Sequence, residues 1–302
     1  MTRAGDTVAR ACRKLFPVLE RLGVHVTPVH FYEPIPDTRT LAPSLWERES
    51  ELVGVDLNAQ AQLELLRWLH GLRDELAELA SGGRGAGDEA ARFRLENGHF
   101  DHADAYALYG IVRRFGPKKI VEVGSGFSTL VAAAALERNR QDGRPGSLVC
   151  IEPYPKPWLR DLEGVDELRE QPLESLPLND LTALSAGDVL FLDSTHVVRT
   201  GGDVVYEFLD VVPRLAPGVL VHVHDVFLPQ EYPKHWLLEQ RRFWTEQYLV
   251  QAFLAFNSDW EILWAGNWLR LNHHETWREA LPMVPETFVP GSLWMRRRDR
   301  VG

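Results

Sequence analysis

The chain has 302 residues, of which 45% are hydrophobic, and a formal net charge of −10 at pH 7. This length is sufficient for one large hydrophobic core, and the acidic charge argues against nonspecific binding to nucleic acid, which needs a basic face. No segment has the roughly 20 uncharged apolar residues of a membrane span, and the 2 cysteines suit a reducing compartment, so we expect a cytoplasmic protein that binds neither membrane nor nucleic acid.

The first 95 residues are expected to form a helical accessory region. Residues 1–22 carry charges throughout and place apolar side chains at helical spacing, which predicts an amphipathic helix rather than a signal peptide. The proline-rich segment 28–36 must run extended. A second helix is predicted over 58–79, and the glycine-rich run 81–87 indicates a linker. This region is a candidate lid over a ligand site.

From about Asp101 short apolar runs alternate with helical stretches, the pattern of β-α-β units around a parallel sheet. The last two predicted strands have no obvious helix between them, so the seventh strand is expected to lie antiparallel beside the sixth. Residues 96–302 are therefore predicted to form an α/β, Rossmann-like domain with a seven-stranded, mostly parallel sheet. Strands are predicted at 119–123, 147–151, 168–171, 188–192, 219–224, 260–264 and 292–296, and helices at 128–138, 157–162, 203–215 and 234–256.

Ligands of open α/β sheets bind beyond the carboxyl ends of the strands, so polar residues at those ends are candidate site residues. The first predicted strand ends in the motif E-x-G-x-G at 122–126, where glycines let the backbone turn tightly and a following helix offers free N–H groups. A dinucleotide fingerprint would have glycine in place of Thr129, which disfavours a nicotinamide or flavin cofactor. Glu152, at the end of the second strand, is placed to accept both hydroxyls of a ribose.

These motifs resemble those of the class I S-adenosylmethionine-dependent methyltransferases. The segments DVLFLDSTHV, PRLAPGVLVHVHDVFLP and EQYLVQAFLAFN further resemble a bacterial subgroup of that superfamily that acts on small molecules. The resemblance implies that S-adenosylmethionine is bound, with its methionine portion at the glycine loop, its ribose at Glu152 and its adenine near 171–174. The residues that the resemblance assigns to the cofactor are Glu122, Gly124, Ser125, Gly126, Ser128, Glu152 and Gln171.

Two aspartates end neighbouring predicted strands, Asp193 after the fourth and Asp225 after the fifth. Adjacent strands lie about 4.8 Å apart, so the two carboxylates can share a divalent cation. This resembles the metal-dependent O-methyltransferases of the catechol and caffeoyl-coenzyme A type, which implies Mg²⁺ or Mn²⁺. Those families have asparagine after the second aspartate, where this chain has Val226, and His224 is therefore a candidate third ligand.

His196 follows Asp193 by three positions. The catechol enzymes have lysine there as the proton acceptor, and some metal-dependent sugar O-methyltransferases of natural-product pathways have histidine. Histidine accepts a proton near neutral pH, and a metal-bound hydroxyl loses its proton more easily. We therefore expect methyl transfer from S-adenosylmethionine to a small-molecule hydroxyl, with His196 as general base beside Asp193.

Two other functional classes stay open. A metal-dependent hydrolase or oxygenase on this fold could use the same strand-end groups, as in centres with two histidines and one carboxylate. The other open class is a non-catalytic protein that binds the cofactor. The groups concerned are Asp193, His196, His222, His224 and Asp225. In each case the expected partner is a small molecule, and a homodimer is compatible with the sequence.

Three further polar features are expected to be structural. His222, one step deeper than His224, is expected to be a hydrogen-bonded core residue. The cluster from His99 to Asp104 is expected to be a solvated loop with a helix cap, and His273 and His274 are expected to lie in a loop.

Overall fold

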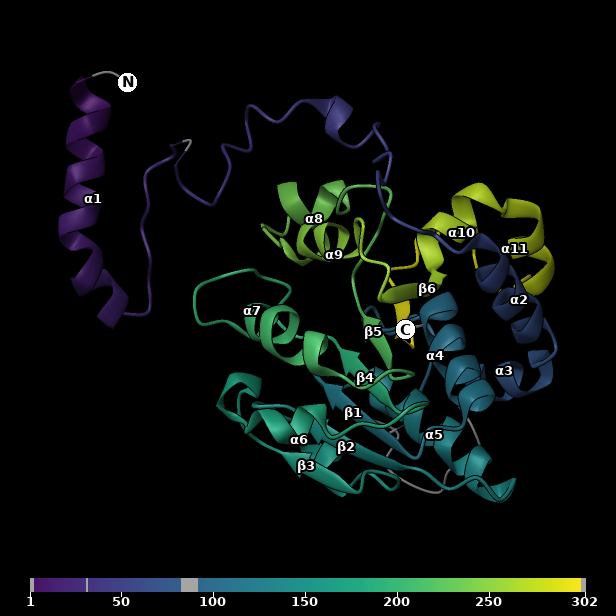
Figure 1. Ribbon diagram of the computed structural model, residues 1–302. Helices are drawn as coiled ribbons and strands as arrows, with labels where there is room; N and C mark the ends of the chain where they lie inside the picture. Colours follow the sequence, from purple (N-terminus) through teal and green to yellow (C-terminus); the bar gives the residue numbers. More distant parts are fainter. Residues whose placement is uncertain (1–2, 31, 83–91, 300–302) are drawn as a thin grey trace. The chain divides into compact units, whose positions relative to one another are not determined.

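The computed structural model describes residues 3–30, 32–82 and 92–299, and these form two compact units (Figure 1). The first unit comprises Met1–Arg48 and Pro233–Phe243. Its helices are α1 (Arg3–Arg21), the 3₁₀ turn η1 (Pro43–Leu45) and α8 (Lys234–Leu238). The two segments of this unit meet where the Arg241 guanidinium donates to the Thr38 hydroxyl at 3.2 Å. Helix α1 confirms the helix predicted over 1–22.

The second unit comprises Glu49–Tyr232 and Trp244–Gly302 and contains a seven-stranded sheet in the order β3-β2-β1-β4-β5-β7-β6. Strands β1 to β5 pair in parallel, whereas β7 is antiparallel to both β5 and β6. The chain therefore has the predicted Rossmann-like fold with an antiparallel last strand. The strands are β1 (Lys119–Val123), β2 (Ser147–Ile151), β3 (Glu167–Arg169), β4 (Val189–Leu192), β5 (Leu220–Val223), β6 (Trp260–Ala265) and β7 (Leu293–Arg297).

Helices cover both faces of the sheet. Successive strand residues point to opposite faces, and because the strands are apolar throughout, both faces need to be covered. On one face a core that includes Ile120 and Phe191 packs against one set of helices, and on the other a core that includes Val121 and Leu190 packs against a second set. The first set is α2 (Ala59–His70), α3 (Arg73–Ala80), α4 (His102–Phe115), α5 (Phe127–Gln141), α10 (Gly266–Asn272) and α11 (His274–Ala280). The second set includes α6 (Leu178–Thr182), α7 (Asp203–Tyr206) and α9 (Glu246–Leu254).

Short helical turns complete the second unit, and they account for two differences from the prediction. The stretch predicted as one helix over 203–215 is α7 followed by a π turn and a 3₁₀ turn, and the helix predicted over 157–162 is a 3₁₀ turn. Pro213 cannot supply a backbone N–H to continue a helix, which is consistent with the break. The turns are η3 (Pro157–Asp161), η4 (Leu173–Ser175), η5 (Glu207–Val211) and η6 (Val212–Arg214).

Three other helix predictions were wrong in extent or kind. The helix predicted over 58–79 is divided at Gly71 into α2 and α3, and the one predicted over 234–256 is divided into α8 and α9. Between β6 and β7, where a direct connection was expected, lie α10 and α11, so His274 begins a helix rather than lying in a loop. Each of these helices has at most twelve residues, and such short segments give a weak periodic signal.

His99 lies exposed in a loop and Asp101 is the N-cap residue of α4, as expected, but the helix begins at His102 and its first turn is not solvated. His102 and Asp104 are buried, with 9% and 4% of their surfaces exposed. The Asp104 carboxylate accepts the backbone N–H groups of Gly291 and Ser292 at 3.0 and 2.9 Å, so it joins α4 to the segment that enters β7. Residues all around α4 are buried, which removes the amphipathic pattern by which a helix is recognised.

The units divide the chain after Arg48, whereas the sequence suggested an accessory region of 95 residues. Helix α2 packs against β6 and α11 within the second unit. The predicted linker at 81–87 lies mostly outside the described residues. In the described part of the chain, no helix is both long and apolar enough to cross a membrane.

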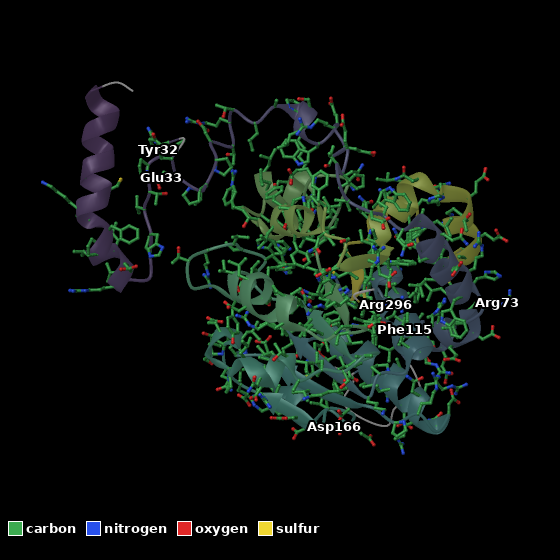
Figure 2. The ribbon with its side chains drawn as sticks, viewed as in Figure 1. Tyr32, Glu33, Arg73, Phe115, Asp166 and Arg296 are labelled. Atoms are coloured by element: carbon green, nitrogen blue, oxygen red, sulfur yellow. The ribbon has the colours of Figure 1, made fainter. Side chains whose placement is uncertain are left out.

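The side of the sheet where the parallel strands begin and the side where they end differ in chemistry. At the edge where β1, β4 and β5 begin, Arg296 of β7 lies beside Phe115, the last residue of α4, with its guanidinium carbon 6.0 Å from the ring centroid (Figure 2). At the opposite edge, where these strands end, lie Gly124, Asp193 and Asp225. This second edge is where ligands of open α/β sheets bind.

Candidate functional site

The glycine loop after β1 is packed directly against the end of β4. Gly124 has a φ of +76°, and a Cβ at this position would overlap the carbonyl oxygen of Asp193. Its N–H donates to the carbonyl of Ile151 at 3.0 Å. Only glycine fits here, and its fit brings the loop into contact with one of the two strand-end aspartates.

Glu122 lies beneath this loop, with 1% of its surface exposed. Its carboxylate accepts the hydroxyls of Ser128 at 2.7 Å and Thr129 at 2.6 Å, and the Thr129 hydroxyl accepts the N–H of Gly126 at 3.0 Å. Burial raises the pKa of Glu122 to about 7, although the two hydroxyl hydrogen bonds oppose the shift. Glu122 and Ser128 therefore contact each other and fix the loop to the start of α5, while direct contact of these side chains with a cofactor stays a prediction.

Thr129 was read from the sequence only as a missing glycine. In the structure its hydroxyl is completely buried and links the glycine loop to Glu122. A hydroxyl that both donates and accepts suits this position, because a carboxylate lies on one side and a backbone N–H on the other.

Glu152, just after β2, lies beside the glycine loop. Its carboxylate accepts the backbone N–H of Ser125 at 3.3 Å and that of Tyr154 at 2.8 Å. Gln171 is exposed and follows β3, which pairs with β2. The residues assigned by resemblance to the ribose and adenine thus lie on the same edge of the sheet as the loop, and their binding roles stay predictions.

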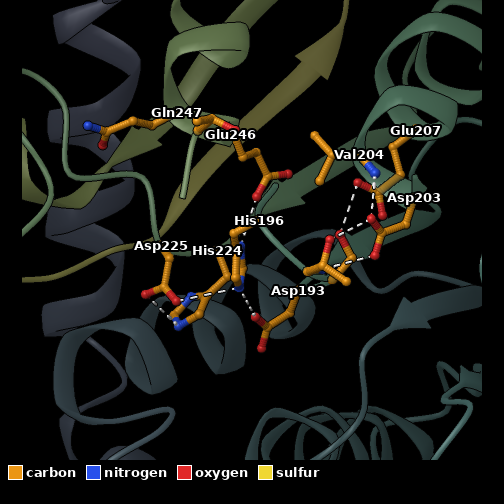
Figure 3. A network of polar contacts seen from close by, with 12 residues as sticks. Asp193, His196, Asp203, Val204, Glu207, His224, Asp225, Glu246 and Gln247 are labelled. Carbon is orange, nitrogen blue, oxygen red and sulfur yellow. Dashed lines mark hydrogen bonds and ion pairs between the residues drawn. The ribbon is translucent and has the colours of Figure 1, made fainter. Parts of the chain in front are cut away.

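Asp193, His196 and Asp225 come together at the ends of β4 and β5, as the sequence predicted (Figure 3). The His196 Nε2 atom lies 3.2 Å from Asp193 Oδ1 and 3.6 Å from Asp225 Oδ2. One ligand atom from each residue lies within 4.8 Å of the other two. This spacing suits a divalent cation held by two oxygens and a nitrogen, or an imidazolium held between two carboxylates.

His196 is buried, and its backbone has a φ of +60°, in the left-handed region. Its Nδ1 atom lies 2.8 Å from Oε2 of Glu246, the first residue of α9 (Figure 3). The Trp244 ring covers the imidazole, with ring centroids 4.4 Å apart. Burial lowers the pKa of His196, but the hydrogen bonds with Asp193 and Glu246 and the charge of Asp225 raise it well above its usual value. The ring is therefore a doubly protonated imidazolium at neutral pH as long as no metal cation lies between the carboxylates of Asp193 and Asp225.

Asp193 stays ionised beside this ring. Burial raises its pKa, but the charges of His224 and His196 and the hydrogen bond from His196 outweigh burial, so the pKa of Asp193 lies below its usual value. Asp225 has a φ of +56° and, like His196, departs from the conformation that L-residues prefer.

His224 does not join the group of three ligand atoms. Its Nε2 atom lies 3.6 Å from Asp225 Oδ1, on the side of that carboxylate away from the His196 contact at Oδ2. Burial lowers the pKa of His224, but the charges of Asp225 and Asp193 raise it overall. Of the described residues, His196 rather than His224 completes the closest set of candidate ligands.

His222 is a core residue, but the expected hydrogen bonds were wrong. Its ring is fully buried and stacks on Phe191 with centroids 4.0 Å apart. Neither ring nitrogen has a hydrogen-bond partner among the described residues. Burial lowers the pKa of His222 well below its usual value, so the ring is neutral.

A second group of buried acids holds the loop between Asp193 and His196. The Thr195 hydroxyl donates to Asp203 at 2.6 Å, and the Ser194 hydroxyl donates to Glu207 at 3.3 Å (Figure 3). Burial and the neighbouring charge of Glu246 raise the pKa of Glu207 well above its usual value. Neither Glu246 nor Glu207 was identified from the sequence, since both lie in mostly apolar helical segments with no spacing that relates them to Asp193.

Three comparisons with known proteins each gave a match. Residues 121–226 match the model of a family described as a methyltransferase domain. An uncharacterized protein of Archaeoglobus fulgidus is 29% identical over 187 residues, which are 58% of this chain and 76% of that protein. The crystal structure of the plantazolicin methyltransferase BpumL, in complex with a triazolic desmethylPZN analogue and S-adenosylhomocysteine, is 10% identical and covers 81% of this chain and 100% of that chain, with a TM-score of 0.36.

The segment matched by the family runs from β1 to the residue after Asp225. It contains the glycine loop, Glu152 and both strand-end aspartates, and it lies within a seven-stranded sheet whose last strand is antiparallel. Residues 121–226 are therefore similar to a methyltransferase domain, and the sheet order and the glycine loop are consistent with that similarity.

Proposed function

We propose that this protein transfers the methyl group of S-adenosylmethionine to a hydroxyl oxygen of a small molecule. His196 is the general base, and Asp193 and Asp225 hold Mg²⁺ or Mn²⁺. The observation that carries the proposal is the position of His196 Nε2, which faces both strand-end carboxylates at 3.2 and 3.6 Å. Asp193 is in turn packed against Gly124 of the loop assigned to the cofactor.

The residues of this edge have distinct tasks in such a reaction. The glycine loop and Glu152 bind the cofactor, whose sulfonium supplies a methyl group that leaves readily. His196 Nε2 takes the proton of the acceptor hydroxyl, the oxygen forms a bond to the methyl carbon, and the carbon–sulfur bond breaks to leave S-adenosylhomocysteine. The Trp244 ring and the burial of His196 keep water from the base. Most of the rate enhancement then comes from positioning the oxygen in line with the carbon–sulfur bond.

The donor set fits a hard divalent cation. Two carboxylates are ligands that suit Mg²⁺ and Mn²⁺, and they leave His196 free to accept a proton. A bound cation would lower the pKa of the acceptor hydroxyl. It would also replace the imidazolium proton as the positive charge between Asp193 and Asp225, which leaves His196 neutral and able to act as a base.

The first test combines a chelator with a His196→Ala variant. Turnover on a panel of small hydroxyl compounds should be lost with a chelator and restored by Mg²⁺ or Mn²⁺. His196→Ala should reduce kcat by about 10²–10⁴-fold, because it removes the base, while calorimetry shows unchanged affinity for S-adenosylhomocysteine. His274→Ala, a substitution of an exposed histidine on α11, is the control. Chelator-insensitive turnover would remove the metal from the proposal, and unchanged turnover in His196→Ala would remove the base.

A second function is favoured by one observation, the close Asp193–His196–Asp225 group. If His196 is itself a ligand, the three residues form a metal centre suited to a hydrolase or an oxygenase. That function predicts a tightly bound iron or zinc ion in elemental analysis and no measurable affinity for S-adenosylmethionine. A non-catalytic protein would bind the cofactor and methylate no acceptor.

A further inference from the structure

Glu246 is a buried acid that contacts His196, the proposed base. Its Oε2 atom lies 2.8 Å from His196 Nδ1, the ring nitrogen opposite the one that faces Asp193 and Asp225. The backbone joins the same two segments, because the N–H groups of Thr245 and Glu246 donate to the His196 carbonyl at 2.9 and 3.1 Å. The Thr245 hydroxyl also accepts the N–H of Val198 at 2.8 Å. The start of α9 is thus fixed to the His196 loop at both backbone and side chain.

A carboxylate in this buried position lowers the stability of the fold. Glu246 is only 2% exposed, and its second oxygen, Oε1, has no hydrogen-bond partner among the described residues. Removing a carboxylate from water without full pairing costs several kcal/mol. Its place in the first turn of α9 offsets a small part of that cost through the helix dipole. Packing alone would be served better by an apolar side chain.

Neutral imidazole carries its proton on one nitrogen and its lone pair on the other. A carboxylate can only accept a hydrogen bond, so an ionised Glu246 favours the tautomer with the proton on Nδ1 of His196. The lone pair then lies on Nε2, the atom that faces the two aspartates and the proposed acceptor. Asp193 and Asp225 attract a proton to Nε2 as long as no cation lies between them, so Glu246 selects the Nδ1–H form once a cation is bound there.

We infer that Glu246 is a positioning residue, which fixes the tautomer and the orientation of His196 so that Nε2 is the reactive nitrogen. This inference rests on the proposed function of His196, whether that nitrogen takes a proton or binds a cation. Partners of this kind behind a functional imidazole contribute about 10–100-fold to activity or metal affinity. Glu246 itself does not reach the reacting atoms.

The test measures the tautomer directly and needs no substrate. The full chain is labelled with ¹⁵N-histidine, and the ring nitrogen shifts of His196 are assigned by their loss in His196→Ala. With saturating Mg²⁺ at alkaline pH, where the ring is neutral and a cation rather than a proton lies between Asp193 and Asp225, the wild type should carry its proton on Nδ1. Glu246→Ala should show a mixture of tautomers or a proton on Nε2. Glu246→Gln conserves volume if the alanine variant fails to fold, and it should also shift the ring away from a pure Nδ1–H form, since an amide can donate as well as accept.

Glu207→Gln is the matched control, because Glu207 is equally buried and bonds to Ser194 rather than to His196. It should leave the Nδ1–H tautomer in place. Where an acceptor has been found, Glu246→Ala should lower kcat by about 10–100-fold with the KM for S-adenosylmethionine unchanged.

The inference and the proposed function fail in different ways. The positioning role would be overturned, whatever the activity, if the ring nitrogen shifts of Glu246→Ala matched those of the wild type. If only Glu246→Gln folds, the same comparison is made with that variant. A wild type that methylates no acceptor would overturn the proposed function, while the shifts still decide what Glu246 does.

Discussion

The contacts of His196 come from two sources: the ends of two neighbouring strands supply Asp193 and Asp225, and the start of α9 supplies Glu246. Asp193, His196 and Asp225 follow two strands that the sequence identifies by their apolar runs, and the ends of neighbouring parallel strands share one edge. Glu246 comes from the start of a helix some 50 positions after His196. Its approach depends on how α9 packs on one face of the sheet, and no local pattern in the sequence encodes that packing.

Gly124 gives a prediction at the scale of one residue. Gly124→Ala should destabilise the fold by several kcal/mol, because it combines a left-handed φ with overlap of the new Cβ and the Asp193 carbonyl oxygen. Gly143→Ala isolates the backbone effect, since Gly143 also has a φ of +76° but has no atom within 4 Å of an added Cβ. The control should lose about 1–2 kcal/mol. Urea unfolding measures both, and equal losses would show that the contact with Asp193 is unimportant.

Glu122 makes stability depend on pH. Its pKa is about 7 in the folded protein and 4.5 in the unfolded chain, so between these values the folded state holds a proton that the unfolded state lacks. Stability conferred by this group is therefore present below pH 4.5 and is lost as the pH rises towards 7, by about 3 kcal/mol in all.

Glu122→Gln should remove this dependence and flatten the free energy of unfolding between pH 5 and about 8. Unfolding in urea at several pH values measures the slope. Glu78→Gln, at an exposed glutamate of α3, should keep the wild-type slope. An unchanged slope in Glu122→Gln would mean that Glu122 is ionised throughout.

At the scale of elements, the strands were predicted well and the helices less so. Runs such as Val189–Leu192 are apolar throughout and lie between polar turns, and β1 and β2 begin and end where the sequence indicated. Helix α4 was not predicted because its residues are buried on all sides, and α10 and α11 were not predicted because each has only 7 residues. Periodicity reports a helix only where one face is polar over several turns.

Asp104 joins two elements that are far apart in the sequence. Asp104→Ala should cost about 2–4 kcal/mol, because it leaves the buried N–H groups of Gly291 and Ser292 without an acceptor. Asp101→Ala is a matched control, since Asp101 also accepts two backbone N–H groups, from Asn97 and Gly98, but is less buried. Denaturant unfolding should show a loss at least twofold smaller for the control. Equal losses would place the stabilisation in the hydrogen bonds rather than in their burial.

At the scale of the whole molecule, the stable core belongs to the second unit. None of the side chains described between residues 11 and 48 is buried, and the buried apolar residues begin at Leu52. The sequence indicated a separate accessory region here but did not fix its boundary, because α2 has the same amphipathic character as a helix of either unit.

Deletion of residues 1–48 should therefore leave the melting temperature within about 2 °C of that of the full chain. Affinity for S-adenosylhomocysteine should also be unchanged, because the glycine loop, Glu152 and both aspartates lie in the second unit. Scanning calorimetry and titration calorimetry measure these quantities. The predicted lid role would appear as lower turnover at unchanged cofactor affinity. A large fall in melting temperature would show that the first unit stabilises the second.

The position of β7 bears on how the protein is made. This strand follows β6 in the sequence but lies between β5 and β6 in the sheet. While the chain emerges from the ribosome, β6 has no neighbour in the sheet until Leu293–Arg297 has been synthesised. Gly291, against which Asp225 packs, emerges only just before that strand. The strand ends that carry the candidate site are thus among the last parts of the fold to be completed during translation, although the glycine loop is made long before.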